Sequence, residues 1–432
     1  MKSLKKILTT AALCATLFAT GCSSETSKSS TGASSSGGDK KETVSFTYWG
    51  GDFDKKRMES IRTEFNKEHP DINVKLIQIP SDGYDQKLLT SMAGGEPYDV
   101  VQVAEAFNTY AGKGTLTDLT PYMEKDGVNK DDYFKAGIDA YSYKGKVMAM
   151  PMRLGAMIML YNKDLFDKNG IPYPTDQWTW EDFRNAAMKI SNKKDGTFGV
   201  QGVGSWWANY MAYVESFGGG LMSDDHTKFT LDSPESKQAL HFMQDMLYKD
   251  KVAPLSSDIP KGVDLWTSGK IGILVDGPWW ILTSQANIKD FKWDVATLPK
   301  GAEFTSPLFS NAFAIPNGSK HKDAAWEVVK FWTGKEGQTV LASEHGEVPP
   351  LKSVANSNAF LYEDGQSPNL KALVNSVDHA FVPPITSKWG EINKLADTYL
   401  GPIFVENKNI DKQLKEMKPQ VEQLLKEAQQ AN

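Results

Sequence analysis

Tryptophan residues beside turns and strand ends are the feature of this sequence best suited to binding chemistry. They fall in four places: Trp49 before Gly50-Gly51, Trp206-Trp207 in a glycine-flanked stretch, Trp279-Trp280 after Gly277-Pro278, and Trp389 after Pro383-Pro384. An indole presents a flat apolar face that suits the C–H face of a pyranose, while carboxylates, amides and backbone groups bind the hydroxyls. Core packing explains any single tryptophan equally well. The four groups together predict a sugar-binding site.

Motifs of catalytic chemistry are weak by comparison. The six histidines are scattered without a zinc-ligand spacing, and the chain has neither a phosphate-binding loop nor a GxSxG elbow. Ser191 and Ser319 each begin an SxxK sequence, but the SDN and KTG companions are missing. A carboxylate pair for glycoside cleavage remains open, because 54 acidic residues offer many pairs. The sequence therefore predicts no catalytic residue, no metal site and no cofactor.

The N-terminus reads as an export signal that ends at a cysteine. Three lysines precede residues 7–20, which are apolar or small, and Gly21 comes directly before Cys22. This stretch is too short to span a bilayer, so we expect a signal peptide over residues 1–21. The position of Cys22 resembles a bacterial lipobox, although Ala19 stands where that pattern prefers Leu. We expect lipidation of Cys22 and a flexible linker over residues 22–43; an ordinary signal peptide with a chance cysteine is the alternative.

Composition limits the remaining classes. About 390 of the 432 residues follow the linker, enough for two domains with their own cores. A net charge of −6 disfavours nucleic acid as a partner, because phosphate binding needs clustered cations. It also disfavours adsorption to anionic lipid, so an acyl group on Cys22 would hold the protein at the membrane. The only other cysteine, Cys14, lies in the signal peptide, so the processed chain cannot form an internal disulfide.

Periodicity predicts an α/β fold. Alternation from Val44 begins a first strand, residues 72–79 form a second and residues 99–103 a third, with helical spacing between them. Strands that alternate with helices imply a parallel sheet with helices on its faces. Further on, Thr179 and Ser233 are expected to cap helices, residues 271–275 and 312–315 to form strands, and Ser319 to precede a helix stopped by Gly334. The C-terminal segment is expected to be helical, with a break near Pro419.

A series of short segments in a fixed order resembles one known family. They are residues 65–74 (FNKEHPDINV), 93–100 (AGGEPYDV), 114–119 (GTLTDL), 145–151 (GKVMAMP), 160–166 (LYNKDLF), 179–183 (TWEDF), 269–279 (GKIGILVDGPW) and 346–352 (GEVPPLK). The chain from Val44 onward is identified by them as a member of the family 1 extracellular solute-binding proteins, the sugar-binding lipoproteins of bacterial ABC importers. Tyr98 departs from the pattern, which usually has Pro before that Asp.

The resemblance implies a two-domain type II periplasmic-binding-protein fold with a hinge and an interdomain cleft. Domain 1 is expected at residues 44–153 and 312–352, and domain 2 at residues 154–311 and 353–432. Arg153 and Asn311 would then lie near the crossings. The ligand-binding residues implied are Trp279 as the principal stacking aromatic, Trp206, Trp207, Trp49, Glu105, Asp52, Asn311, Arg153 and, by a looser match, Trp389. Ala106 and Gly155 occupy places where maltose-binding relatives carry charged ligands, so maltodextrin specificity is not implied.

The hypothesis is thus a monomeric receptor, anchored to the outer face of the cell membrane, that delivers a mono- or oligosaccharide to the permease subunits of an ABC importer. Domain closure would be its mechanism. Three alternatives remain open: a binding protein for a polyamine, amino acid or metal chelate, a lipid-anchored glycosidase, and a receptor that serves a sensor kinase.

Overall fold

The computed structural model describes residues 41–362 and 365–430. The expected signal peptide, Cys22, Cys14 and most of the expected linker lie outside these residues. The first strand, β1 (Glu42–Tyr48), begins two residues before the expected Val44, so the folded part starts inside the segment assigned to the linker. No helix of the described part combines the length and the apolar character needed to cross a membrane.

The first sheet has the strand order β12-β11-β3-β1-β2, with β6 paired to β11. The three expected strands are confirmed: β1 pairs in parallel with β2 (Ile72–Gln78) and with β3 (Val100–Val103). Strand β11 (Ser306–Ala314) pairs antiparallel with β3, and β6 (Ala149–Ala156) pairs antiparallel with β11. The short β12 (Ala380–Phe381) is parallel to β11. The sheet is therefore mixed rather than wholly parallel.

Helices cover this sheet and bury its aromatic side chains. Phe46 of β1 packs edge-on against Phe313 of β11 at 4.7 Å between ring centroids, and against Trp332 at 5.5 Å. The helices of this part are α1 (Asp52–Glu68), α2 (Tyr84–Ala93), α3 (Phe107–Gly112), α4 (Thr120–Asp126), α5 (Lys135–Ala140), α11 (Lys322–Thr333), α12 (Lys335–Ala342) and α13 (Lys352–Ala355). A small hairpin is made of β4 (Ser142–Tyr143) and β5 (Lys146–Val147).

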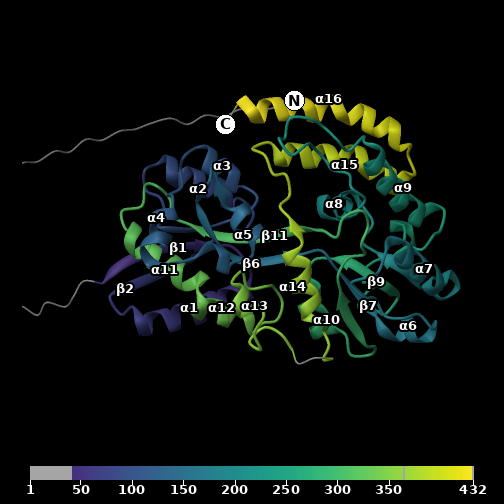
Figure 1. Cartoon of the computed structure of the whole chain (residues 1–432), viewed down its shortest axis with the longest axis horizontal. Coiled ribbons are helices and arrows are strands. Elements are labelled where there is room, and N and C mark those ends of the chain that lie inside the picture. The colour runs from purple at the N-terminus through teal and green to yellow at the C-terminus, as the bar shows by residue number, and fades with distance from the viewer. Residues whose placement is uncertain (1–40, 363–364, 431–432) are drawn as a thin grey trace, which may run out of the picture. The chain divides into compact units, whose positions relative to one another are not determined.

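The second sheet has the order β10-β7-β9-β8. Its strands are β7 (Ile158–Asn162), β8 (Phe198–Gln201), β9 (Ile271–Asp276) and β10 (Trp293–Ala296). The surrounding helices are α6 (Lys163–Lys168), α7 (Trp180–Ile190), α8 (Trp207–Ser216), α9 (Pro234–Tyr248), α10 (Trp279–Asn287), α14 (Leu370–Asp378), α15 (Trp389–Glu406) and α16 (Ile410–Gln430). Helices α15 and α16 run together beside α9, as Figure 1 shows in yellow. The expected caps are confirmed: the hydroxyl of Thr179 accepts from the N–H of Asp182, and that of Ser233 from Ser236.

Strands β6 and β11 connect the two sheets. They pair antiparallel over their length, lie side by side at the centre of Figure 1, and β6 continues almost directly into β7. The register shifts at Asn311/Ala312, where Met152 is the extra residue of a β-bulge. The side-chain amide of the buried Gln338 donates to the Met152 carbonyl at 3.0 Å, which satisfies the group that the bulge removes from the ladder. The bulge lies beside the domain boundaries predicted at 153/154 and 311/312, which stay a prediction.

Two of the later local expectations are confirmed and one is wrong. Ser319 precedes α11, which begins at Lys322 after His321; the Ser319 hydroxyl donates to Asp99 at 2.7 Å and accepts from the His321 N–H. The helix ends at Thr333 and is stopped at Gly334, whose φ of −85° and ψ of −173° are extended rather than left-handed. The break expected near Pro419 is wrong: helix α16 continues through this residue, because buried Met417, Val421 and Leu425 hold it on the core on both sides of the proline.

Candidate functional site

A cavity of about 300 Å³ is lined by residues of the first sheet and its loops and by helices that surround the second sheet. Trp49 follows β1 and Glu105 follows β3, so both stand at the carboxyl ends of parallel strands. Trp207 and Trp279 are the first residues of α8 and α10, on the side of the second sheet. The remaining lining includes Asn108, Tyr141, Arg153, Leu308, Phe309, Ser310, Asn311, Glu347 and Val382.

Phe309 of β11 is the centre of an aromatic cluster on one wall. Its ring centroid lies 5.0 Å from Trp279 and 5.5 Å from Trp207, and it stacks within 5° of parallel on Trp206 at 5.8 Å. Trp206 also contacts Trp279 at 5.9 Å between centroids. Rings at these distances support one another, so the cluster offers a preformed apolar surface.

The position of the Trp279 indole depends on Gly277. A Cβ atom at residue 277 would lie 2.1 to 2.4 Å from three atoms of the indole ring, so only glycine leaves room for this arrangement. The backbone N–H of Gly277 also donates to the carboxylate of Asp276 at 2.7 Å. Burial raises the pKa of Asp276, and hydrogen bonds from Gly277, Trp280 and Trp279 offset part of that rise. The end of β9 thus fixes an indole that remains 40% exposed toward the cavity.

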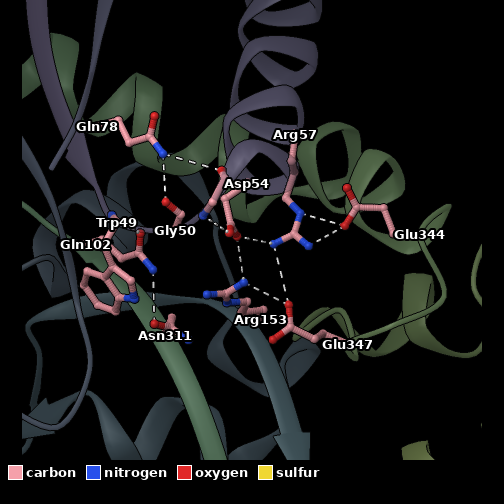
Figure 2. Close-up of polar contacts among 11 residues, drawn as sticks. Trp49, Gly50, Asp54, Arg57, Gln78, Gln102, Arg153, Asn311, Glu344 and Glu347 are labelled. Carbon is pink, nitrogen blue, oxygen red and sulfur yellow. Dashed lines mark hydrogen bonds and ion pairs between the residues drawn. The ribbon is translucent and has the colours of Figure 1, made fainter. Parts of the chain in front are cut away.

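A charged network, drawn in Figure 2, supplies Arg153 and Glu347 to the polar wall of the cavity. One Nη of Arg153 lies 3.1 Å from Asp54 Oδ1 and 3.0 Å from Glu347 Oε2. The buried Arg57 pairs with Glu344 at 2.5 Å and also approaches Asp54 and Glu347. Burial alone would lower the pKa of Arg153, but the carboxylates of Glu347 and Asp54 outweigh it and raise that pKa. Two guanidinium groups face three carboxylates, so the network is rigid and carries no excess positive charge.

Neutral polar groups complete this wall. The Gln102 amide donates to Asn311 Oδ1 at 3.1 Å, and its oxygen accepts from the Trp49 backbone N–H at 3.3 Å (Figure 2). The Tyr141 hydroxyl lies 3.0 Å from the Ser310 hydroxyl. Burial raises the pKa of Tyr141 above its ordinary value, so its phenol stays a hydrogen-bond donor. One wall is therefore apolar and the other polar, which matches a ligand with an apolar and a hydroxylated face.

Six of the nine predicted ligand-binding residues line this cavity: Trp49, Glu105, Arg153, Trp207, Trp279 and Asn311. The other three are placed elsewhere. Trp206, 37% exposed, borders the cavity through its stacking on Phe309. Trp389 is only 6% exposed and packs behind Trp207 at 5.8 Å, because it begins α15 rather than a loop. Asp52 is exposed at the start of α1, and its neighbour Asp54 enters the network instead.

Phe309, Asp54, Glu347 and Tyr141 belong to the site or its network but were not predicted from the sequence. Glu347 belongs to the GEVPPLK segment, whose place in the resemblance was a signal for it. Phe309 had no such signal, because the expected strand began only at residue 312. Within residues 41–362 and 365–430, no cluster of three or more His, Cys, Asp or Glu side chains has the arrangement of a metal site.

Comparison with known proteins agrees with this architecture. The sequence profile of the bacterial extracellular solute-binding proteins matches residues 50–339. The mannitol-binding protein of Pseudomonas aeruginosa is 29% identical over 327 residues, covering 71% of this chain and 73% of that protein. The arabinooligosaccharide-binding protein of Bacillus subtilis is 26% identical over 339 residues, 74% of each chain. An ABC substrate-binding protein of Listeria monocytogenes, solved with cycloalternan, is 28% identical with a TM-score of 0.77, covering 89% of this chain and 98% of that one.

These matches define an extracellular solute-binding protein with the two-domain α/β fold of that class, so the fold predicted from the sequence is confirmed. Because the profile spans more than half of the chain, the protein belongs to the bacterial extracellular solute-binding protein family. The resemblance found in the sequence is thereby confirmed. The family's name refers to a location outside the cytoplasm and to binding rather than to catalysis.

Proposed function

We propose that this protein binds a carbohydrate in the central cavity and delivers it to an ABC importer. The observation that carries the proposal is the pairing of an aromatic wall, Trp279, Trp207 and Phe309, with a wall of fixed hydrogen-bonding groups across about 300 Å³. Apolar C–H faces stack on indoles, whereas hydroxyls bind carboxylates and amides. Relatives named for an oligosaccharide and for a polyol support the same class of ligand.

The charges of the site favour an uncharged sugar over an acidic one. Arg153 is the only lysine or arginine among the lining residues of the described chain, and its guanidinium already pairs with Asp54 and Glu347. Glu105, also in the lining, adds a further negative charge. A uronate or a sugar phosphate would therefore enter a site with no unpaired cation to receive it.

Domain closure is the mechanism we propose. A ligand held between groups of both sheets stabilises the closed arrangement more than the open one and so shifts the population. The Asn108 amide of α3 donates to the Ile385 carbonyl at 2.7 Å, and both residues line the cavity. Contacts of this kind would form on closure, and the bulge between β6 and β11 is the place where the backbone can bend.

Membrane anchoring through Cys22 and the monomeric state also belong to this proposal. When the full chain is expressed in a bacterial host, we expect the wild-type protein in the membrane fraction and the Cys22→Ala variant outside it. Mass spectrometry of the mature N-terminus should find an acylated cysteine at residue 22. A mature N-terminus at another residue would contradict the anchor without affecting the ligand site.

A thermal-shift screen tests the ligand class. Saturating ligand at 100 times Kd stabilises the folded state by about 2.7 kcal/mol, which raises the melting temperature by several degrees. We expect shifts with neutral mono- or oligosaccharides and none with polyamines, amino acids or metal chelates. Shifts only with amines would support the rival class of solute. Chromatography of the sugars after incubation should recover them unchanged, and turnover would mean a glycosidase instead.

A further inference from the structure

A second cavity of about 490 Å³ lies next to the proposed ligand site. Its lining includes Glu215, the Gly218–Gly220 turn, Asp224, His226 and hydroxyls of Ser223 and Thr230. It is thus larger than the central cavity and is lined by groups that hydrogen-bond. Nothing in the proposed function so far uses it.

The two cavities meet at one segment and share one helix. Val382 lines both of them, and its neighbours divide between them, Pro383 facing the central cavity and Pro384 the second. Helix α8 carries Trp207 into the central cavity and Glu215 into the second. Eight residues of α-helix separate them by about 12 Å, a span for more than one sugar ring.

Two side chains in the second cavity have no polar partner in the part of the chain that the structure describes. Within the described residues, neither the carboxyl group of Glu215 nor the imidazole of His226 has a hydrogen bond or an ion pair. Burial, and secondly the charge of Asp224, raises the pKa of Glu215 to about 7. Burial also lowers the pKa of His226, although Asp225 and Asp224 oppose it. Near neutral pH His226 is therefore mainly neutral and about half of the Glu215 carboxyl group is protonated, so both side chains can donate and accept hydrogen bonds with hydroxyls.

We propose that the second cavity binds a further, uncharged sugar unit of an oligosaccharide whose other end stacks on Trp207 and Trp279 in the central cavity, with Glu215 and His226 bonding its hydroxyls. This inference rests on the proposed carbohydrate function and names its ligand as an oligosaccharide rather than a monosaccharide. No lysine or arginine of the described chain lines the second cavity, while Asp224 and Glu235 do, so a terminal uronic acid would be repelled.

Calorimetry with linear gluco-, galacto-, manno- and arabino-oligosaccharides of one to five rings tests this assignment on the mature wild-type protein. In the series that binds, affinity should rise at least tenfold between the shortest ligand and the chain of three or four rings. The variant Glu215→Ala/His226→Ala should lose that gain and bind the shortest ligand within twofold of wild type. A chain ending in a uronic acid should bind more weakly than its neutral counterpart.

Control variants separate binding from folding. Glu416→Ala removes an exposed carboxylate of α16 outside both cavities and should keep the full length dependence. His226→Ala alone should lose part of the gain, and thermal unfolding verifies that each variant is folded. Binding of short sugars with no gain from added rings, or a gain that survives in the double variant, would overturn this inference alone. Absence of binding across the whole panel would contradict the carbohydrate function and this inference with it.

Discussion

The substitution Trp279→Ala tests the stacking surface directly. The residue is 40% exposed, which for a tryptophan leaves on the order of 100 Å² for a ligand to cover. At about 25 cal/mol per Å², covering that surface contributes up to about 2.5 kcal/mol, and ring stacking adds about 0.5–1.5 kcal/mol. A sugar covers only part of the indole, so we expect a loss of about 1.5–3 kcal/mol. Affinity for the sugar should therefore fall about 10- to 150-fold.

Isothermal calorimetry with the best-binding sugar of the screen measures this loss, and thermal unfolding gives the accompanying change in stability. Trp279→Phe keeps an aromatic ring and should recover much of the affinity. Trp178→Ala makes the same change at a partly buried tryptophan that packs on Phe166 away from the cavity, and it should leave affinity unchanged. If Trp279→Ala binds the sugar as wild type does, the reasoning about the aromatic wall is refuted.

Three further predictions concern residues other than the stacking tryptophan. Gly277→Ala should displace the Trp279 indole and lower affinity about as much as Trp279→Ala in the same calorimetry, and wild-type affinity would contradict the contact. Glu215→Gln should leave the free energy of unfolding unchanged near pH 4 and raise it by up to about 3 kcal/mol at pH 8. The reason is that a carboxyl group whose pKa rises from 4.5 to about 7 on folding destabilises the folded state as pH increases between those values. Urea unfolding at both pH values checks this, and the same difference between variant and wild type at pH 4 and pH 8 would contradict it. Gln338→Leu removes the side-chain donor from two buried backbone carbonyls, one of them that of Met152. The free energy of unfolding, measured in urea, should fall by about 2–4 kcal/mol. A fall below about 0.5 kcal/mol would show that the bulge does not depend on this side chain.

Elements with a local signal were predictable from the sequence. The alternation of β1 and the capping hydroxyls of Thr179 and Ser233 depend on residues close in the chain, and the structure contains all three. The placement of Trp49 and Glu105 on one cavity followed from a general rule, because parallel strands end at the same edge of a sheet.

Features set by long-range packing were not predictable. The first half of β11 contains Ser306, Pro307 and Ser310, which give no strand signal, so Phe309 was overlooked. This segment of β11 is a strand because β6 pairs with β11 along its length. Asp52 and Asp54 are two helical positions apart and so point to different faces of α1, and only the docking of α1 against Arg153 decides which one enters the site.

The most direct test of the central claim is a crystal structure of the protein with the sugar that binds best in the screen. The account predicts the sugar in the cavity lined by Trp279, Trp207 and Arg153, with a pyranose or furanose face against the Trp279 indole and hydroxyls on the polar wall. A sugar bound at another surface, or at this cavity without contact to the aromatic wall, would contradict it.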